Sequence, residues 1–276
     1  MLHQTFILRE EFPDAHLTTY VCDANTNKGI PPRPAVVICP GGGYHDHSPR
    51  EGEPIARKYL SAGYNAYVLW YSVEENASNY NPLIEAAMAI KFVREHAEEH
   101  HTDPDHVFIC GFSAGGHLAA SAGVFWNHPV VREALGIDAG LAPEGINRPT
   151  GMILCYPVIT SGPYKHYSSF KRLCGNREPS EEEMRPFSLE LHVDETTPPA
   201  FIWHTCADSG VPVQNSLLMA NALIEKGIHS ELHIFPEGPH GLALGTPETC
   251  YGKDTLNLPH VTPWSDLSIA WMRDQF

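Results

Sequence analysis

The chain has 276 residues, of which 42% are hydrophobic, 18% charged and 10% aromatic, and its formal net charge at pH 7 is −15. A chain of this size buries enough apolar surface to fold without disulfides or metals, and its ordinary apolar content argues against disorder. The acidic balance disfavours a nucleic-acid partner, which requires a basic face, and it equally disfavours binding to anionic membranes.

Short apolar runs alternate with longer helical patterns along the chain. The runs of strand length lie at 35–39, 66–71, 107–110, 152–156, 200–204 and 231–235. The helical patterns lie at 53–62, 83–99, 114–124, 213–226 and 264–272. Continuous apolar strands that alternate with helices indicate a largely parallel sheet covered on both faces. Two more polar runs, 5–8 and 18–22, predict an antiparallel edge.

Two long stretches interrupt this alternation. Residues 126–149 and 161–199 are rich in proline, glycine and polar residues, and loops of this length usually carry function. We interpret both as insertions within a single domain, 1–276, and expect them to wall a pocket at the C-terminal edge of the sheet. Inside the second stretch, residues 180–183 match a capping box that opens a short helix.

The N-terminus and the cysteines bear on the cellular compartment. No run approaches the roughly 18 apolar residues of a membrane span, and no basic segment precedes an apolar one at the N-terminus, so we expect no signal peptide. The seven cysteines are scattered and contain no Cys-x-x-Cys pair, which is typical of free thiols in a reducing compartment. The sequence therefore predicts a cytoplasmic protein.

The strongest chemical signal is Gly111-Phe112-Ser113-Ala114-Gly115, a G-x-S-x-G pattern with an apolar strand directly before it and a helix after it. A sharp strand-to-helix turn exposes the serine hydroxyl and requires nearly side-chain-free neighbours two positions away, which Gly111 and Gly115 provide. The helix N-terminus places the Ala114 N–H where an oxyanion would form. The pattern predicts Ser113 as a nucleophile; the alternative is a turn that merely joins strand to helix.

A glycine run follows the first apolar strand. Acyl transfer needs two or more N–H donors directed at the developing oxyanion, and consecutive glycines can present their N–H groups without side-chain obstruction. We therefore predict Gly42 and Gly43 as oxyanion donors beside Ala114, with a flexible turn as the alternative. A phosphate-binding role is disfavoured because no Gly-Lys-Ser/Thr follows. Glu53, which opens the next helix, is interpreted as a solvated acid rather than as a brace for this loop.

A serine nucleophile needs a base, and the base needs an orienting carboxylate. In folds of this kind the expected chain order is serine, acid, histidine. Among 17 histidines, His240 occupies a turn directly after a late strand and is the predicted base. Asp208 follows the strand at 200–204 and is the predicted acid. Three rival acids fit less well. Asp194 precedes its strand, Glu237 shares the loop of His240, and Asp266 comes after His240 and so breaks the chain order.

Other residues suggest weaker roles. Histidine-rich segments at 45–47 and 100–106 could indicate a metal, but the chain has neither His-Glu-x-x-His nor a Cys/His quartet, so we expect no metal and no cofactor. Three aromatic residues, Tyr44, Tyr71 and Trp126, are candidate substrate contacts.

The segments 39–44, 111–117, 208–212 and 238–241 together resemble motifs of the α/β-hydrolase superfamily. The chain is most similar to bacterial carboxylesterases and acetylesterases, including enzymes that deacetylate xylan or sugars. The resemblance covers nearly the whole chain. It implies an α/β fold with a mostly parallel eight-stranded sheet, helices on both faces and no large separate cap.

The same resemblance implies a serine esterase with Ser113, Asp208 and His240 as its triad. Two departures distinguish the chain from neighbouring groups. Hormone-sensitive-lipase-type esterases carry histidine where Pro40 stands, and dienelactone hydrolases carry cysteine where Ser113 stands.

The predicted activity is hydrolysis of short-chain esters, acetyl above all, through an acyl-enzyme, with sugars or xylo-oligosaccharides as candidate alcohols. The expected partner is a small ester, and we expect neither a nucleic-acid nor a membrane partner. The sequence leaves open whether the protein forms a homo-oligomer. The alternatives are a related amidase, formamidase or peptidase of the same fold, and a binding module that has lost the reaction.

Overall fold

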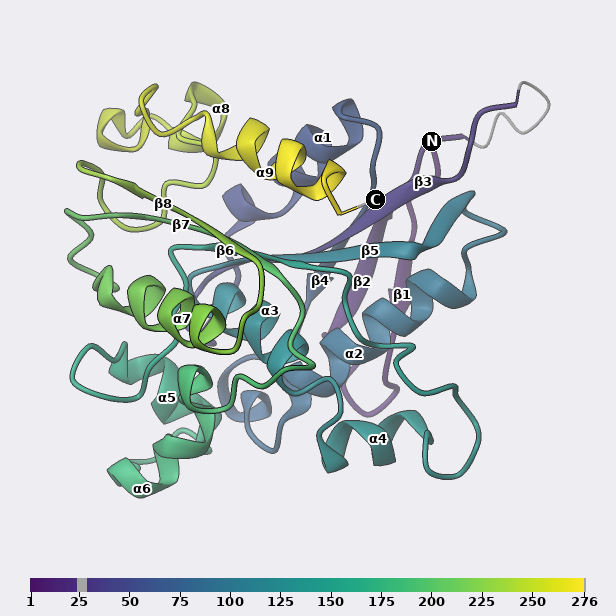
Figure 1. The fold of residues 1–276 in the computed structure, drawn as a ribbon, viewed down its shortest axis with the longest axis horizontal. Helices are drawn as coiled ribbons and strands as arrows, with labels where there is room; N and C mark the ends of the chain where they lie inside the picture. Colours follow the sequence, from purple (N-terminus) through teal and green to yellow (C-terminus); the bar gives the residue numbers. More distant parts are fainter. Residues whose placement is uncertain (24–28, 276) are drawn as a thin grey trace.

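The computed structural model describes residues 1–23 and 29–275 and places one eight-stranded sheet through the middle of that part of the chain (Figure 1). The strand order across the sheet is β1-β2-β4-β3-β5-β6-β7-β8. The strands are β1 (Thr5–Ile7), β2 (His16–Tyr20), β3 (Arg33–Cys39), β4 (Asn65–Trp70), β5 (Thr102–Phe112), β6 (Met152–Cys155), β7 (Ala200–Thr205) and β8 (Ser230–Phe235). Strands β3 to β8 run parallel, and β1 and β2 form an antiparallel edge, as predicted.

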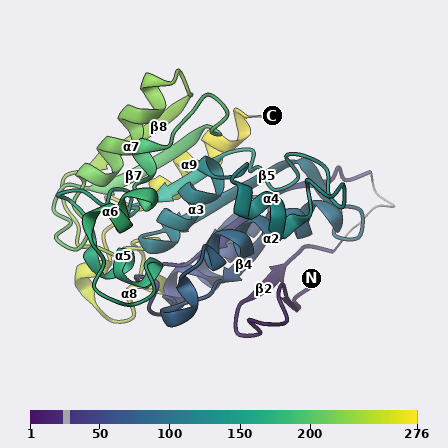
Figure 2. The same cartoon turned by 90° about the horizontal axis from the view of Figure 1, so that it is seen from below.

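Helices cover both faces of the sheet (Figure 1). One face carries α1 (Glu53–Ser61), α8 (Pro247–Cys250) and α9 (Trp264–Arg273). The other face carries α2 (Asn81–Glu95), α3 (Ala114–Val124), α4 (Pro129–Leu135), α5 (Tyr167–Leu173), α6 (Glu181–Met184) and α7 (Gln214–Glu225). Figure 2 shows α7, α3 and α2 lying side by side across this second face. The predicted α/β-hydrolase architecture is thereby confirmed.

Each helix layer encloses its own apolar core. Because strand side chains alternate between faces, Val36 packs with the α1 and α9 residues, and its neighbour Val37 packs with those of α2 and α3. Both valines are fully buried. Because both faces are buried, each parallel strand appears in the sequence as a continuous apolar run. The strand positions could therefore be predicted from the sequence. Helix α2 ends at Glu95, before the predicted 99, because its apolar stripe ends at Val93.

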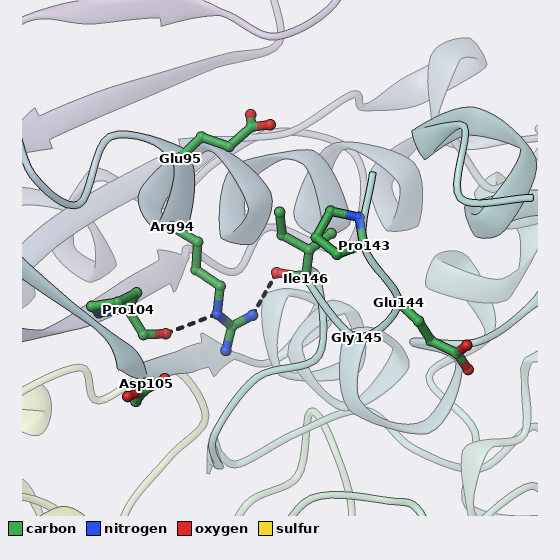
Figure 3. Close-up of a pocket in the computed structure, with 8 residues that line it drawn as sticks. All are labelled: Arg94, Glu95, Pro104, Asp105, Pro143, Glu144, Gly145 and Ile146. Carbon is green, nitrogen blue, oxygen red and sulfur yellow. Dashed lines mark hydrogen bonds between the residues drawn. The ribbon is translucent and has the colours of Figure 1, made fainter. Parts of the chain in front are cut away.

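The two long insertions begin at opposite ends of the parallel strands. Residues 126–149 follow α3, which returns the chain from the C-terminal to the N-terminal edge between the parallel strands β5 and β6. Arg94 holds this segment beside the start of β5, since its guanidinium donates to the carbonyls of Ile146 (2.5 Å) and Pro104 (2.9 Å) (Figure 3). The expectation that residues 126–149 wall the active site is therefore wrong: α3 carries the chain away from that edge.

The second insertion, 161–199, follows the C-terminal end of β6 and carries α5 and α6. Ser180 and Glu183 form the predicted capping box at the start of α6, each side chain bonding to the other's backbone N–H. In the residues that the structure describes, no helix is both long and apolar enough to cross a membrane.

Candidate active site

Ser113 occupies a strained turn between β5 and α3. Its backbone has φ 55° and ψ −116°, a conformation that a non-glycine residue rarely adopts. The flanking glycines cannot be replaced without a clash. A Cβ at Gly111 would lie 2.0 Å from the carbonyl oxygen of Gly115, and a Cβ at Gly115 would lie 2.1 Å from that of Cys39. The local sequence thus allows the turn that raises the Ser113 hydroxyl above the sheet.

The three predicted triad residues meet at the carboxyl ends of β5, β7 and β8. His240 Nε2 lies 2.7 Å from Ser113 Oγ, and His240 Nδ1 lies 2.6 Å from Asp208 Oδ2. Because the carboxylate can only accept, Nδ1 carries the ring proton, and Nε2 is left to accept from the serine hydroxyl. The geometry suits proton transfer from Ser113 to His240.

The Asp208 carboxylate is held by several donors. Its Oδ1 accepts from the backbone N–H groups of Gly210 (2.8 Å) and Val211 (2.9 Å). Its Oδ2 accepts from His204 Nε2 (3.2 Å) as well as from His240. Burial alone would raise the pKa of Asp208, but hydrogen bonds from the two histidines outweigh it and hold the pKa well below the usual range. The acid is therefore ionised at neutral pH.

His204 is a feature that sequence reasoning missed. The strand pattern predicts a packed histidine, and its side chain is indeed fully buried. Its Nε2 also faces the carbonyl of Val211 (3.0 Å), and its Nδ1 lies 2.7 Å from Ser216 Oγ. Since both partners of Nε2 are acceptors, Nε2 carries the proton, and Nδ1 accepts from the Ser216 hydroxyl.

The glycine loop after β3 presents unpaired N–H groups. Among the described residues, the N–H groups of Gly42 and Gly43 meet no protein acceptor, and both residues line the cleft that contains Ser113. Ala114 begins α3, so its N–H has no intrahelical acceptor. Gly42 has φ +140°, and a Cβ there would lie 2.0 Å from the Asp46 carbonyl oxygen, so the loop requires glycine at this position.

A buried carboxylate, Glu51, braces this loop. Its Oε2 accepts from the Gly41 N–H (2.8 Å), and its Oε1 accepts from the Tyr156 hydroxyl (2.6 Å), which in turn accepts from the Ala243 N–H (2.8 Å). Burial and the nearby Glu51 charge raise the pKa of Tyr156 well above its usual range. Glu53 is exposed, in agreement with the interpretation of the sequence. The carboxylate that braces the loop belongs to Glu51, two residues earlier.

The cleft above Ser113 has a volume of about 450 Å³. Its wall consists only of glycines and polar or charged residues: Gly42, Gly43, His45, Asp46, Ser48, Arg50, Glu51, Ser113, His166, Ser168, Arg172, His240 and Gly241. Three of these come from the insertion at 161–199. In residues 1–23 and 29–275, no three His, Cys, Asp or Glu side chains gather in a metal-binding arrangement.

The three predicted aromatic contacts do not line this cleft. Tyr44 and Tyr71 are each 1% exposed. The Tyr44 hydroxyl bonds to His117 Nδ1 (2.9 Å), and the Tyr71 hydroxyl donates to the Pro40 carbonyl (2.6 Å), so both support the glycine loop from the core. Trp126 lies at the opposite sheet edge, where its indole N–H donates to Thr196. Tyr44 turns inward where the loop backbone has φ +57°, and Tyr71 enters the core directly after β4.

The sheet topology and the positions of the serine, acid and histidine after β5, β7 and β8 define an α/β-hydrolase. The chain belongs to the BD-FAE family, whose model matches residues 23–223. It is 40% identical to endo-1,4-beta-xylanase B of Butyrivibrio fibrisolvens over 78% of this chain and 33% of that protein. It is 30% identical to an acetylxylan esterase of Xylanibacter ruminicola over 77% of this chain and 42% of that protein. The chain thus spans less than half the length of these two relatives.

Solved structures match over nearly their full length. An acetyl ester-xyloside bifunctional hydrolase from Caldicellulosiruptor lactoaceticus superposes with a TM-score of 0.81 and 34% identity, covering 98% of this chain and 96% of that one. A carboxylesterase from Lactobacillus plantarum superposes with a TM-score of 0.84 and 27% identity, covering 100% and 98%. The resemblance inferred from the sequence motifs is therefore confirmed.

Proposed function

We propose that this protein is a serine carboxylesterase that hydrolyses short-chain esters, acetyl above all, with sugars or xylo-oligosaccharides as the alcohol. The observation that carries the proposal is the continuous hydrogen-bonded chain from Ser113 through His240 to Asp208, with contacts of 2.7 and 2.6 Å. The similarity to an acetylxylan esterase and to an acetyl ester-xyloside hydrolase supports the acyl group and the alcohol.

In this proposal Ser113 Oγ attacks the ester carbonyl while His240 Nε2 takes the hydroxyl proton. The carbonyl oxygen becomes an oxyanion and accepts from the N–H groups of Gly42, Gly43 and Ala114. His240 then protonates the leaving alcohol, and the acetyl group stays on Ser113. A water molecule then gives a proton to His240 and attacks the acyl carbon; the bond to Ser113 Oγ breaks, the acid leaves, and Ser113 Oγ takes the proton back from His240. Asp208 remains ionised and stabilises the imidazolium throughout.

We also propose that residues 1–276 form one hydrolase domain, with the insertion at 161–199 as part of the cleft wall. A cytoplasmic location is proposed as well, and the free state of all seven cysteines supports it.

The acyl-chain preference tests the proposed function. The cleft wall offers no aliphatic or aromatic side chain to a long acyl chain, so a long chain covers polar groups without replacing their hydrogen bonds to water, which costs binding energy. We expect kcat/KM for p-nitrophenyl acetate to exceed that for the octanoate by about tenfold or more, with the butyrate in between. A preference for octanoate, measured under the same conditions, would contradict the proposal.

A second expected result concerns His204, which shares Asp208 Oδ2 with His240. Removing the His204 hydrogen bond leaves the Asp208 carboxylate with one donor fewer, so it holds the His240 ring less firmly toward Ser113. His204→Phe should therefore lower kcat/KM for p-nitrophenyl acetate by about tenfold, whereas His204→Gln, which can keep a donor, should lower it less. An unchanged kcat/KM in His204→Phe would show that His204 only fills space.

A further inference from the structure

The imidazole of His166 lies in the catalytic cleft but takes no part in the proposed chemistry. It comes from the insertion at 161–199, directly before α5. A Cβ built on Gly43 would lie 3.5 Å from His166 Cε1, so the ring stands against the proposed oxyanion loop. Burial, followed by the nearby ionisable groups His240 and Arg172, lowers the pKa of His166. The ring is therefore neutral at pH 7.

One ring nitrogen of His166 is anchored and the other is not. Nδ1 lies 2.8 Å from the hydroxyl of Ser169, a residue that is 1% exposed. Within the described part of the chain, the only contact of Nε2 is a long one, 3.4 Å, to Ser168 Oγ, which also lines the cleft. The anchoring serine fixes the ring, so Nε2 is preorganised for a ligand.

The tautomer decides what Nε2 offers. If the Ser169 hydroxyl donates to Nδ1, then Nε2 carries the proton and donates; if the hydroxyl accepts, then Nε2 accepts. A hydroxyl group on the ligand can satisfy either case, because it is both a donor and an acceptor. The ligand group that best fits His166 Nε2 is therefore a hydroxyl group.

The acetyl half of the substrate cannot supply that alcohol. Its one polar atom is the carbonyl oxygen, which the proposed mechanism assigns to the N–H groups of the glycine loop and Ala114. A partner for Nε2 must then belong to the alcohol half of the ester. Because the ring lies against Gly43 and within electrostatic reach of His240, the matching hydroxyl lies close to the reacting bond.

We propose that His166 is a specificity-determining residue that binds the hydroxyl group on the carbon next to the esterified one. The inference rests on the proposed function. It predicts that the enzyme prefers esters of vicinal diols over otherwise identical esters of simple alcohols.

Two acetates that differ by one hydroxyl isolate this contact: cyclohexyl acetate and the monoacetate of trans-1,2-cyclohexanediol. We expect wild-type kcat/KM to favour the diol monoacetate by about tenfold, the contribution of one good hydrogen bond. His166→Ala should bring the ratio close to one, because kcat/KM falls further on the diol monoacetate than on cyclohexyl acetate. His166→Asn, which keeps a donor and an acceptor, should restore part of the preference.

The matched control is His192→Ala, an exposed histidine of the same insertion that lies outside the cleft and should keep the full preference. Equal losses on both acetates in His166→Ala would indicate a structural role and overturn the inference, as would a preference that survives the substitution. Wild-type turnover of both acetates without preference would overturn the inference alone. Turnover of neither would overturn the proposed function and the inference with it.

Discussion

Ser113→Ala should lower kcat/KM for p-nitrophenyl acetate by at least about 10⁴-fold and abolish covalent labelling by a fluorophosphonate probe. The proposed reaction requires an oxygen nucleophile within hydrogen-bond distance of His240 Nε2, and Ser113 Oγ stands there at 2.7 Å. Alanine keeps the Cβ, so the backbone of the turn is not further strained. Thermal unfolding should therefore change little, which separates loss of chemistry from loss of structure.

Ser121→Ala provides the matched control. Ser121 is a buried serine on α3, and its hydroxyl donates to the His117 carbonyl (2.8 Å) rather than facing the cleft. This variant should still be labelled by the probe. Labelling that persists in Ser113→Ala, or activity within tenfold of wild type, would show that another residue is the nucleophile.

Glu51→Ala should lower kcat/KM by about 10² to 10³-fold, the effect of losing one preorganised oxyanion donor. The carboxylate is 2% exposed and joins the Gly41 N–H to the Tyr156 hydroxyl. Without it the glycine loop loses its anchor, so the N–H groups of Gly42 and Gly43 lose their alignment. Leaving two buried donors unpaired costs about 2 to 4 kcal/mol, which corresponds to a fall of roughly 3 to 7 °C in Tm.

The control for this effect stands two residues further along the chain. Glu53 is exposed, and its carboxylate lies 3.7 Å from Arg57 in a surface pair, which contributes little to stability. Glu53→Ala should therefore leave both kcat/KM and Tm near wild-type values. If Glu51→Ala behaves like Glu53→Ala, the carboxylate does not hold the loop.

Several features of the molecule were predictable because their causes are local. The turn at Ser113 needs glycine two positions away on each side, and Gly111 and Gly115 are both present in the same five residues. The parallel strands are buried on both faces, so each appears as an unbroken apolar run that periodicity detects. The order of serine, acid and histidine pointed to Asp208 and His240, and the structure places both next to Ser113.

Other features depended on how distant segments return to each other. Glu51 and Glu53 differ little in sequence context, and only the approach of Tyr156, 105 residues away, shows which of them braces the loop. His166 enters the cleft only because the insertion at 161–199 folds back over the glycine loop. The insertion at 126–149 is also rich in proline, glycine and polar residues, yet α3 carries it to the N-terminal edge of the parallel strands.

Backbone sterics and the period of apolar residues act over a few neighbours along the chain, so the amino-acid sequence specified the strands, most of the helices and the nucleophile turn. Which side chains share the cleft depends on contacts between residues about a hundred positions apart. These contacts exist only once the sheet has brought the strand ends together, and so the three-dimensional packing alone decided the brace and the cleft wall.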